Sequence, residues 1–246
     1  MLKWVLTPDE FAHVWATETG LDYRPYPINA MIPVVPDLPA AGADHESSGV
    51  RQHYVRNTDP DLTAALLLCA RPDATALTVA GERGATAERI IAFAAVAQQH
   101  AAILVARRES VVVLICHSQA VGRQLVQVIG SAPAGRNATM REATDAVLDP
   151  DHILGPDLYD ARLLDPELLD PVVRFQRTLR APVDSRGIVT VTTAPNDSSS
   201  PPTRHRTWLD VAGDGRYLLT TAGQLTLTPV DDEAFATQLL RLSGLL

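Results

Sequence analysis

The sequence predicts an α+β protein whose central, largely antiparallel sheet is shared by two halves related by a pseudo-twofold axis. The first observation is a repeat, because residues 89–128 and the last forty residues carry the same apolar pattern at an offset of 114 positions. In each copy, apolar residues two apart fit strands, and later apolar residues spaced by four and then three fit one helix face. The second observation is that the gaps between the expected strands are too short for helical crossovers, so neighbouring strands must be antiparallel. The superposed positions are Ile103 and Val105 on Tyr217 and Leu219, Val111 and Val113 on Leu225 and Leu227, and Val121, Leu125 and Val128 on Phe235, Leu239 and Leu242.

Length and composition are typical of a globular protein. The 246 residues can bury a substantial core, and we expect a single domain over 1–246 whose halves span about 1–135 and 136–246. Apolar residues make up 46% of the chain and charged residues 20%, which favours a folded over a disordered protein. The net charge of -8 disfavours binding to nucleic acid or to anionic membrane through a general positive field.

Other features of the sequence predict a cytoplasmic protein. The chain has no apolar run near the ~18 residues that a membrane span needs, and its opening residues lack the long apolar stretch of a signal peptide. Cys69 and Cys116 both lie in apolar runs, which favours buried free thiols over a disulfide. We therefore expect a cytoplasmic location without membrane insertion.

Helix-start signals place the first elements. Residues 2–6 fit a short strand, after which Thr7 and Glu10 form a capping box that opens a helix. Prolines break the regularity of residues 23–57, which we expect to be loop-rich. A second helix starts at Asp59 and runs to about residue 71. The apolar stripes are Phe11, Val14 and Trp15 in the first helix and Leu62, Leu66 and Cys69 in the second.

Two sheet units account for most of the remaining chain. The first has strands at 74–80, 89–97, 101–107 and 111–116 and a helix at 118–129. The second has strands at 187–193, 205–211, 216–220 and 224–228 and a helix at 231–242. An irregular bridge over 131–157 and a helix near 166–180 join the units, and the polar residues 194–203 predict a solvated hairpin tip.

The strand–turn–helix around Ser118 resembles the G-x-S-x-G turn that presents the nucleophile of many hydrolases. Cys116 and Ala120 stand where that turn needs glycines, and hairpin spacing conflicts with the parallel sheet of that fold. Ser118 is therefore interpreted as a helix N-cap, with Asp232, preceded by Asp231, in the equivalent position of the second copy. A serine hydrolase that uses Ser118 stays open as an alternative.

The rest of the sequence predicts no catalytic residues, metal site or cofactor. The segment 81–86 joins two strands instead of opening a helix and lacks the lysine of a phosphate loop, so it is expected to be an exposed hairpin turn. The seven histidines have no partners at metal-ligand spacing. The carboxylates at helix starts are explained by the helix dipole.

Three stretches occur together in a recognisable order. The opening stretch is Thr7-Pro8-Asp9-Glu10-Phe11 with Val14-Trp15, and the second runs from Asp59-Pro60-Asp61-Leu62 to Leu68-Cys69-Ala70-Arg71-Pro72. The closing stretch is Trp208-Leu209-Asp210-Val211, then Gly215-Arg216-Tyr217-Leu218, then Pro229-Val230-Asp231 before a terminal helix. This order resembles the EspG family, the secretion-associated cytosolic chaperones of actinobacterial type VII (ESX) systems. The resemblance covers nearly the whole chain and departs at 40–57, where the family usually has an amphipathic helix.

The resemblance implies two helical bundles beside the shared sheet and a function that is not enzymatic. It implies binding of PE–PPE heterodimers at the apolar tip of the PPE subunit, which keeps them soluble and directs them to their secretion system. Covering such a tip removes an aggregation site. In the family the contacts come from the loop between the second and third strands and from the C-terminal bundle, which by position are 81–88 and the helix near 166–180. The expected partner-binding residues are Gly81, Glu82, Arg83, Gly84, Ala85, Thr86, Phe175 and Leu179. An interaction scaffold with a different client is the second alternative.

Overall fold

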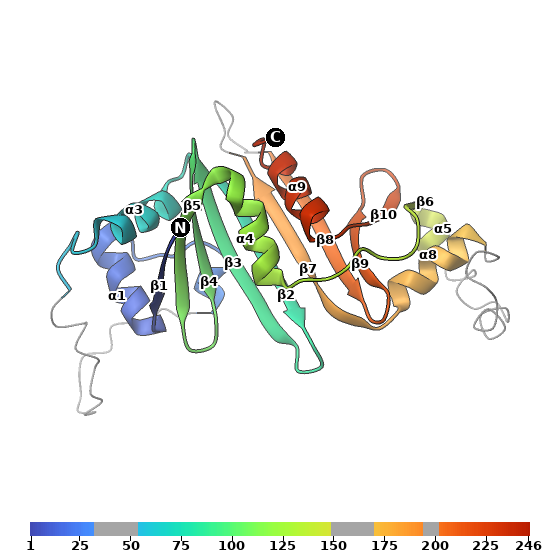
Figure 1. The fold of residues 1–246 in the computed structure, drawn as a ribbon, viewed down its shortest axis with the longest axis horizontal. Helices are drawn as coiled ribbons and strands as arrows, with labels where there is room; N and C mark the ends of the chain where they lie inside the picture. The colour runs from blue at the N-terminus through green and yellow to red at the C-terminus, as the bar shows by residue number, and fades with distance from the viewer. Residues whose placement is uncertain (32–53, 149–169, 194–201) are drawn as a thin grey trace.

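The sheet is continuous through both halves of the protein (Figure 1). The computed structural model describes residues 1–31, 54–148, 170–193 and 202–246. Its strands form one ten-stranded sheet in the order β1-β5-β4-β3-β2-β7-β8-β9-β10-β6, and each neighbouring pair is antiparallel. The strands are β1 (Leu2–Leu6), β2 (Thr75–Arg83), β3 (Glu88–Ala97), β4 (His100–Ala106), β5 (Val111–His117), β6 (Met140–Glu142), β7 (Val183–Thr192), β8 (Thr203–Val211), β9 (Gly215–Thr220) and β10 (Leu225–Pro229). The large antiparallel sheet with its helices confirms the predicted fold class.

The predicted repeat is visible in the strand order. Strands β3, β4 and β5 follow on one side of the central β2–β7 pair, and β8, β9 and β10 follow on the other. The helix after each unit, α4 (Val121–Ile129) or α9 (Asp232–Leu242), lies on the same face of the sheet, and the two helices pack side by side (Figure 1). Because one sheet joins both units, we infer a single domain with halves at about 1–135 and 136–246.

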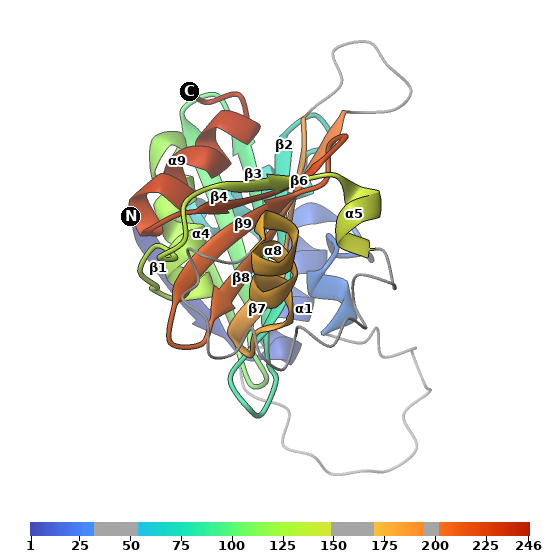
Figure 2. The same ribbon diagram turned by 90° about the vertical axis from the view of Figure 1, so that its right-hand side faces the viewer.

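Two helical bundles cover the ends of the opposite face. Helices α1 (Pro8–Thr19) and α3 (Pro60–Ala70) pack on the β3–β5 end, with the short turn η1 (Ile28–Ala30) beside them. Helices α5 (Thr144–Leu148) and α8 (Pro171–Arg180) pack on the β9–β10–β6 end. Figure 2 shows α4 and α9 on one side of the sheet and α1 and α5 on the other. Within the described residues, no helix covers the middle of this second face, over β2, β7 and β8.

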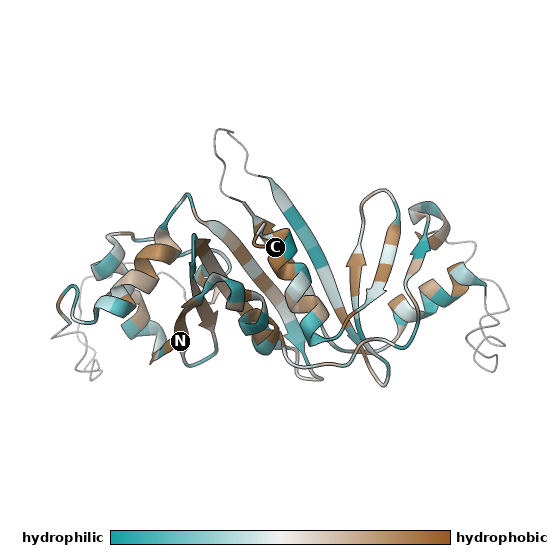
Figure 3. Cartoon of the chain, turned by 45° about the horizontal axis from the view of Figure 1, so that its top comes forward, coloured by the Kyte–Doolittle hydropathy of each residue, from teal (hydrophilic) through white to brown (hydrophobic). Residues whose placement is uncertain are grey.

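The two halves differ in how far their strands are buried. β3, β4 and β5 are apolar on both faces because helices cover both, and they are mostly brown in Figure 3. β8 starts with the exposed run Thr203-Arg204-His205 and becomes buried only toward its end. The first half is therefore a closed three-layer structure, whereas the described residues leave one face of the sheet centre uncovered, and this is called the open face below.

Local signals place the helix starts as predicted. The Glu10 N–H donates to Thr7 Oγ1 at 3.2 Å, and the Thr7 N–H donates to Glu10 Oε2 at 2.8 Å, which completes the capping box of α1. Asp59 Oδ1 accepts from the N–H groups of Asp61 and Leu62 at the start of α3. Asp59 Oδ2 also accepts the Trp4 indole N–H at 2.7 Å, so this cap ties β1 to α3. A helix cap of this type contributes about 0.5–2 kcal/mol.

The structure corrects the role expected for Ser118. His117 is the cap, because its Nδ1 accepts from the Gln119 N–H at 3.3 Å at the start of the 3-10 turn η2 (Ser118–Ala120). Ser118 is buried, and its N–H donates to the Gln99 carbonyl at 2.9 Å, which continues the strand pairing by one more residue. In the second half Asp231 caps α9 by accepting from Ala234 at 2.8 Å. His117 and Asp231 are 114 positions apart, so the cap occupies the same place in both copies of the repeat, one residue before the predicted one.

Three further predictions need correction. The central strands are longer than expected, because the ends of β2 and β7 pair with each other as far as Arg83 and Ser185. The bridge over 131–157 is not wholly irregular, since it holds β6 and α5. Both cysteines are free, but only Cys69 is buried and Cys116 is half-buried. The expectations for 32–53, 149–157, 166–169 and 194–201 lie outside the described residues.

Candidate partner-binding surface

The structure brings the β2–β3 hairpin and α8 to the same end of the central strands. The Gly84 N–H donates to the Asp184 carbonyl at 2.7 Å, at the start of β7. Helix α8 ends at Arg180, shortly before β7 begins at Val183. The hairpin and the C-terminal end of α8 therefore lie at the same end of the sheet, although their residues are about a hundred positions apart in the sequence.

The hairpin carries its charges on the strands and small residues at its tip. Glu82 faces Arg186 across the β2–β7 pair, and Glu82 Oε1 accepts from Arg186 Nε at 2.7 Å. Arg83 donates to the Ile129 carbonyl at 3.4 Å and lies 3.6 Å from a Glu88 carboxylate oxygen. The exposed tip is Gly84-Ala85-Thr86-Ala87. The exposed turn predicted over 81–86 is shorter than expected, because strand pairing continues through Glu82 and Arg83.

A groove of about 710 Å³ lies on the open face of the central strands. Its floor includes Ala80 and Ile188, and Ile188 is 40% exposed although it is apolar. Tyr26 and Pro27 form one wall, and the Glu82–Arg186 ion pair lies at the rim. The other lining residues are Ala30, Gly81, Ala87, Arg89, Ile91, Gly187, Thr207 and Leu209. An apolar floor with a charged rim is the chemistry of a protein-binding surface.

Helix α8 is held to the sheet by the residues that were predicted to contact a partner. Phe175 is fully buried against Tyr217, Leu225 and Leu227, and Leu179 is half-buried against the same cluster. Asp170 caps the helix by accepting from the Val172 N–H at 2.9 Å. Phe175 thus fixes the position of α8, and Arg177 and Arg180 are exposed on the helix.

Comparison with known proteins places the chain in a family. Residues 7–241 match the model of the EspG family. The chain belongs to the EspG family. Among solved structures it is similar to the Mycobacterium tuberculosis type VII secretion system chaperone EspG5 in complex with a PE25–PPE41 dimer, with a TM-score of 0.58 and 14% sequence identity. The match covers 96% of this chain and 94% of that chain, and at this identity it shows a shared fold. A comparison with curated proteins finds no match.

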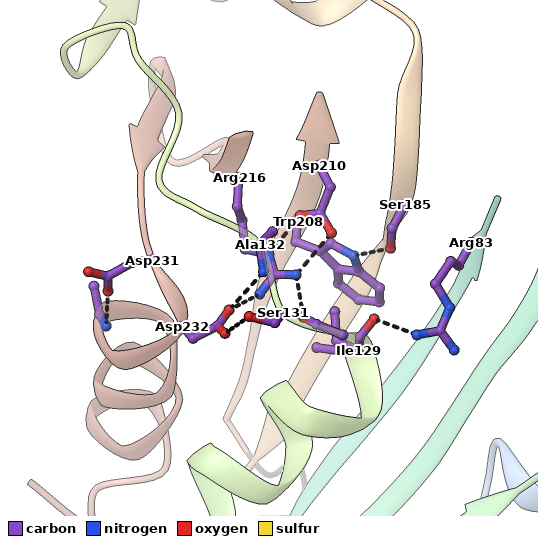
Figure 4. A network of polar contacts seen from close by, with 12 residues as sticks. Arg83, Ile129, Ser131, Ala132, Ser185, Trp208, Asp210, Arg216, Asp231 and Asp232 are labelled. Carbon is purple, nitrogen blue, oxygen red and sulfur yellow. Dashed lines mark hydrogen bonds and ion pairs between the residues drawn. The ribbon is translucent and has the colours of Figure 1, made fainter. Parts of the chain in front are cut away.

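Arg216 and Asp210, both from the closing stretch that resembles the EspG family, are the centre of a buried network that joins the halves (Figure 4). Arg216 is fully buried and binds both oxygens of Asp210, with Nε to Oδ1 at 2.6 Å and Nη2 to Oδ2 at 2.9 Å. It also donates to Asp232 Oδ1 at 3.0 Å and to the Gly130 carbonyl at 2.7 Å. The ring of Phe235 lies 5.4 Å from its guanidinium carbon. Arg216 therefore links β8, the end of α4 and the start of α9.

Two aromatic residues of the same closing stretch, Trp208 and Tyr217, make further contacts. The Trp208 indole N–H donates to Ser185 Oγ at 3.0 Å, and its ring packs on the Gly81–Gly187 pair, where a Cβ atom on Gly187 would overlap it. The Tyr217 hydroxyl donates to Asp214 Oδ2 at 2.8 Å and accepts from the Asn137 N–H at 3.0 Å. Burial of its ring raises the pKa of Tyr217. The closing stretch thus supplies the framework beside the groove, and one of its residues, Leu209, also lines the groove.

The groove and the framework were not predicted from the sequence. Tyr26 and Pro27 lie in a region that was interpreted only as loop-rich, and Ile188 looked like an ordinary strand residue. The sequence shows only that Ile188 is an apolar residue of a predicted strand. It does not show which face of the sheet is left uncovered, so the groove could not be inferred. The buried ion pairs of Arg216 join residues that no sequence spacing relates.

The described residues assemble no hydrolase centre around Ser118. β5 pairs antiparallel with both β1 and β4, so the parallel sheet of an α/β-hydrolase is not formed there. Within the same described ranges, no group of three or more His, Cys, Asp or Glu residues is placed to hold a metal ion. None of the helices described combines the length and apolar character needed to cross a membrane.

Proposed function

We propose that this protein is a cytosolic, substrate-specific chaperone of a type VII (ESX) secretion system that binds the PPE subunit of a PE–PPE heterodimer at its apolar tip. The observation that carries the proposal is the EspG family match over residues 7–241. The similar structure of EspG5, which was solved with a PE25–PPE41 dimer, supports the same partner class. The chaperone would keep the heterodimer soluble and direct it to the secretion machinery, and no catalytic step is assigned to the chain.

The groove on the open face supports the proposal because its chemistry suits an apolar tip. Ile188 and Ala80 offer apolar contact at the floor, and Tyr26 adds an aromatic side chain that is 62% exposed at the wall. Aromatic and aliphatic residues at the centre of an interface supply most of its affinity, while charged rims set orientation. Covering the tip would lower the population of PPE molecules free to aggregate.

The hairpin supports the same surface because it borders the groove, and α8 supports it because the helix leads into the strand that forms the groove floor. The hairpin carries Glu82 at the groove rim, and α8 continues into β7, which supplies the groove floor. The predicted partner residues Gly81–Thr86, Phe175 and Leu179 would then act in two ways. The hairpin residues would contact the client, while Phe175 and Leu179 would hold α8 in place.

The proposal is tested by co-expressing the chain with PE–PPE pairs from the same genome and measuring co-purification. Ile188→Glu places a charge on the groove floor, and we expect it to abolish capture while the melting temperature stays close to wild type. Leu67→Glu is the matched control, because Leu67 is 41% exposed on α3 and lies outside the groove lining, compared with 40% for Ile188. Capture that is equal for both variants, or no capture of any pair by the wild type, would contradict the proposal.

A further inference from the structure

A second cavity, of about 320 Å³, lies between α8 and the bridge that follows α4, and arginines line it. Arg136 comes from the bridge, and Arg174 and Arg177 come from one side of α8, since they are three positions apart. Asp214 is the carboxylate among the described lining residues. Among the described lining residues, positively charged side chains therefore outnumber negatively charged ones.

Asp214 is already held by uncharged donors. Its Oδ1 accepts from the Arg136 backbone N–H at 2.7 Å, and its Oδ2 accepts from the Tyr217 hydroxyl at 2.8 Å. Each of its carboxylate oxygens therefore already accepts a hydrogen bond from a group other than a guanidinium group. The guanidinium groups of Arg136 and Arg174 are therefore not the groups that hold Asp214.

Arg174 has an unused hydrogen-bond donor. Its Nε is buried and has no hydrogen-bond partner among the described residues. Within the described residues, neither the Arg136 nor the Arg174 side chain forms an ion pair. A buried charged donor without an acceptor is unfavourable. An acceptor oxygen that enters this cavity could therefore accept a hydrogen bond from Arg174 Nε.

The two segments that carry these arginines, the bridge and α8, are each packed against the rest of the protein. The bridge is clamped to Tyr217, whose hydroxyl accepts from the backbone and side-chain N–H groups of Asn137 at 3.0 and 3.1 Å. A Cβ atom on Gly135 would overlap the Tyr217 ring, which shows how closely the bridge lies on it. On the other wall, the buried side chain of Phe175 holds α8. A site with preset walls loses little freedom on binding.

The cavity adjoins the groove. Leu209 lines the groove and Val211 lines the cavity, and both are on the same face of β8 because they are two positions apart. A partner seated in the groove can therefore place a neighbouring side chain in the cavity. A helix is about 10 Å wide with its side chains, so the cavity suits one acidic side chain better than a whole helix.

We propose that this cavity binds the carboxylate of an Asp or Glu side chain of the client, next to the apolar tip, and so helps to select the client. This inference rests on the proposed chaperone function. A planar guanidinium binds a carboxylate through two parallel hydrogen bonds, which makes arginine the side chain best suited to this recognition. The net charge of the chain is -8, so a positive cavity is a local feature of this surface and not part of a general positive field.

The test measures the dissociation constant of the purified chain for a PE–PPE pair that it captures on co-expression, at low and high salt. Arg136→Glu and Arg174→Glu should each weaken binding at least about tenfold, because a like charge then faces the client carboxylate. Arg174→Gln, which keeps an N–H donor but loses the charge, should fall between these variants and the wild type. Arg180→Glu is the matched control, since it makes the same charge change at an exposed position of α8 outside the cavity lining and should bind as the wild type does.

Four outcomes are distinguishable. Unchanged affinity of both reversal variants, with capture by the wild type intact, would overturn the inference and leave the proposed function standing. A lower melting temperature of the free variants would show that the arginines pair with carboxylates of this chain, which also overturns it. Stabilisation of the wild type but not of Arg174→Gln by acetate or inorganic phosphate, with client affinity unaffected, would identify a small-anion site instead. Failure of the wild type to capture any pair would contradict the proposed function itself.

Discussion

Gly122 of α4 lies directly against Ala236 of α9, and a Cβ atom on Gly122 would stand 2.5 Å from the Ala236 carbonyl oxygen. The two residues are 114 positions apart and therefore equivalent in the internal repeat. In the sheet beneath them, Gly81 of β2 faces Gly187 of β7. A twofold axis between the halves brings equivalent residues into contact, as it does for these residues of the two helices above the sheet. The close approach at Gly122 thus sets how α4 and α9 pack.

Enlarging Gly122 should force these helices apart. We expect Gly122→Val to lower the free energy of unfolding by about 1–3 kcal/mol, because the added atoms meet backbone that cannot move aside. Gly122→Ala should cost less, since alanine is a better helix former by about 1 kcal/mol. Urea unfolding measures both, with the exposed Gln127→Ala on α4 as a control expected to stay within about 0.5 kcal/mol. Wild-type stability of Gly122→Val would refute the close contact.

The Arg216 network should be the most sensitive polar site in the protein. Arg216→Met leaves Asp210 without its buried partner, and we expect a loss of about 3–5 kcal/mol in the free energy of unfolding. The double variant Asp210→Leu/Arg216→Met leaves no unpaired charge at that pair and should lose less than the two single variants together. Chemical denaturation of the wild type, the two single variants and the double variant gives the coupling free energy between Asp210 and Arg216. Strictly additive losses would show that the two side chains do not act as a pair.

Alkaline pH should destabilise the protein partly through Tyr217. Burial, chiefly, raises the pKa of its hydroxyl, so the folded state favours the neutral form. The stability that this pKa shift of Tyr217 contributes is fully present below the tyrosine pKa of the unfolded chain, about 10. It is lost as the pH rises through the pKa of Tyr217 in the folded protein. Stability should therefore fall as the pH rises above about 10, and the fall should be smaller in Tyr217→Phe. Tyr23→Phe, at an exposed position, should keep the wild-type slope, and equal slopes for all three proteins would contradict the assignment.

The two charges of the Glu82–Arg186 ion pair at the groove rim can be swapped between the positions while the ion pair is kept. In Glu82→Arg/Arg186→Glu the ion pair is retained with reversed charges, and because both side chains are largely exposed, stability should change by no more than about 1 kcal/mol. The charge pattern that a client meets is inverted, so capture of its PE–PPE pair should weaken. A thermal melt and a pull-down on the same preparation separate the two effects. Undiminished capture by this variant would assign the pair a structural role only.

The parts of the fold predicted from the sequence are those that local chemistry determines. The capping residues Thr7, Glu10 and Asp59 act on N–H groups within three positions of themselves, so short spacing was enough to find them. The repeat was detected because both copies bury the same faces of the same elements. The cap before α4 was misplaced by one residue because strand pairing carries β5 through His117.

The rest of the fold depends on pairing between distant residues. The ends of β2 and β7 exist because they pair across more than a hundred positions, and the groove floor is formed by that same pairing. Phe175 was assigned to the partner surface by position in the family, and only the packed sheet shows that it faces the core. Its part in client binding, like that of Gly81–Thr86 and Leu179, remains a prediction.

The central claim is that the client sits in the groove between the two helical bundles. A photo-crosslinking amino acid placed at Ile188, on the groove floor, tests it against the same amino acid placed at Gln127, on the exposed side of α4 on the opposite face of the sheet. Each variant is co-expressed with a PE–PPE pair, irradiated and analysed by mass spectrometry. We predict a crosslink from position 188 to the tip of the PPE subunit and none from position 127. A crosslink from position 127 with none from position 188 would contradict the account.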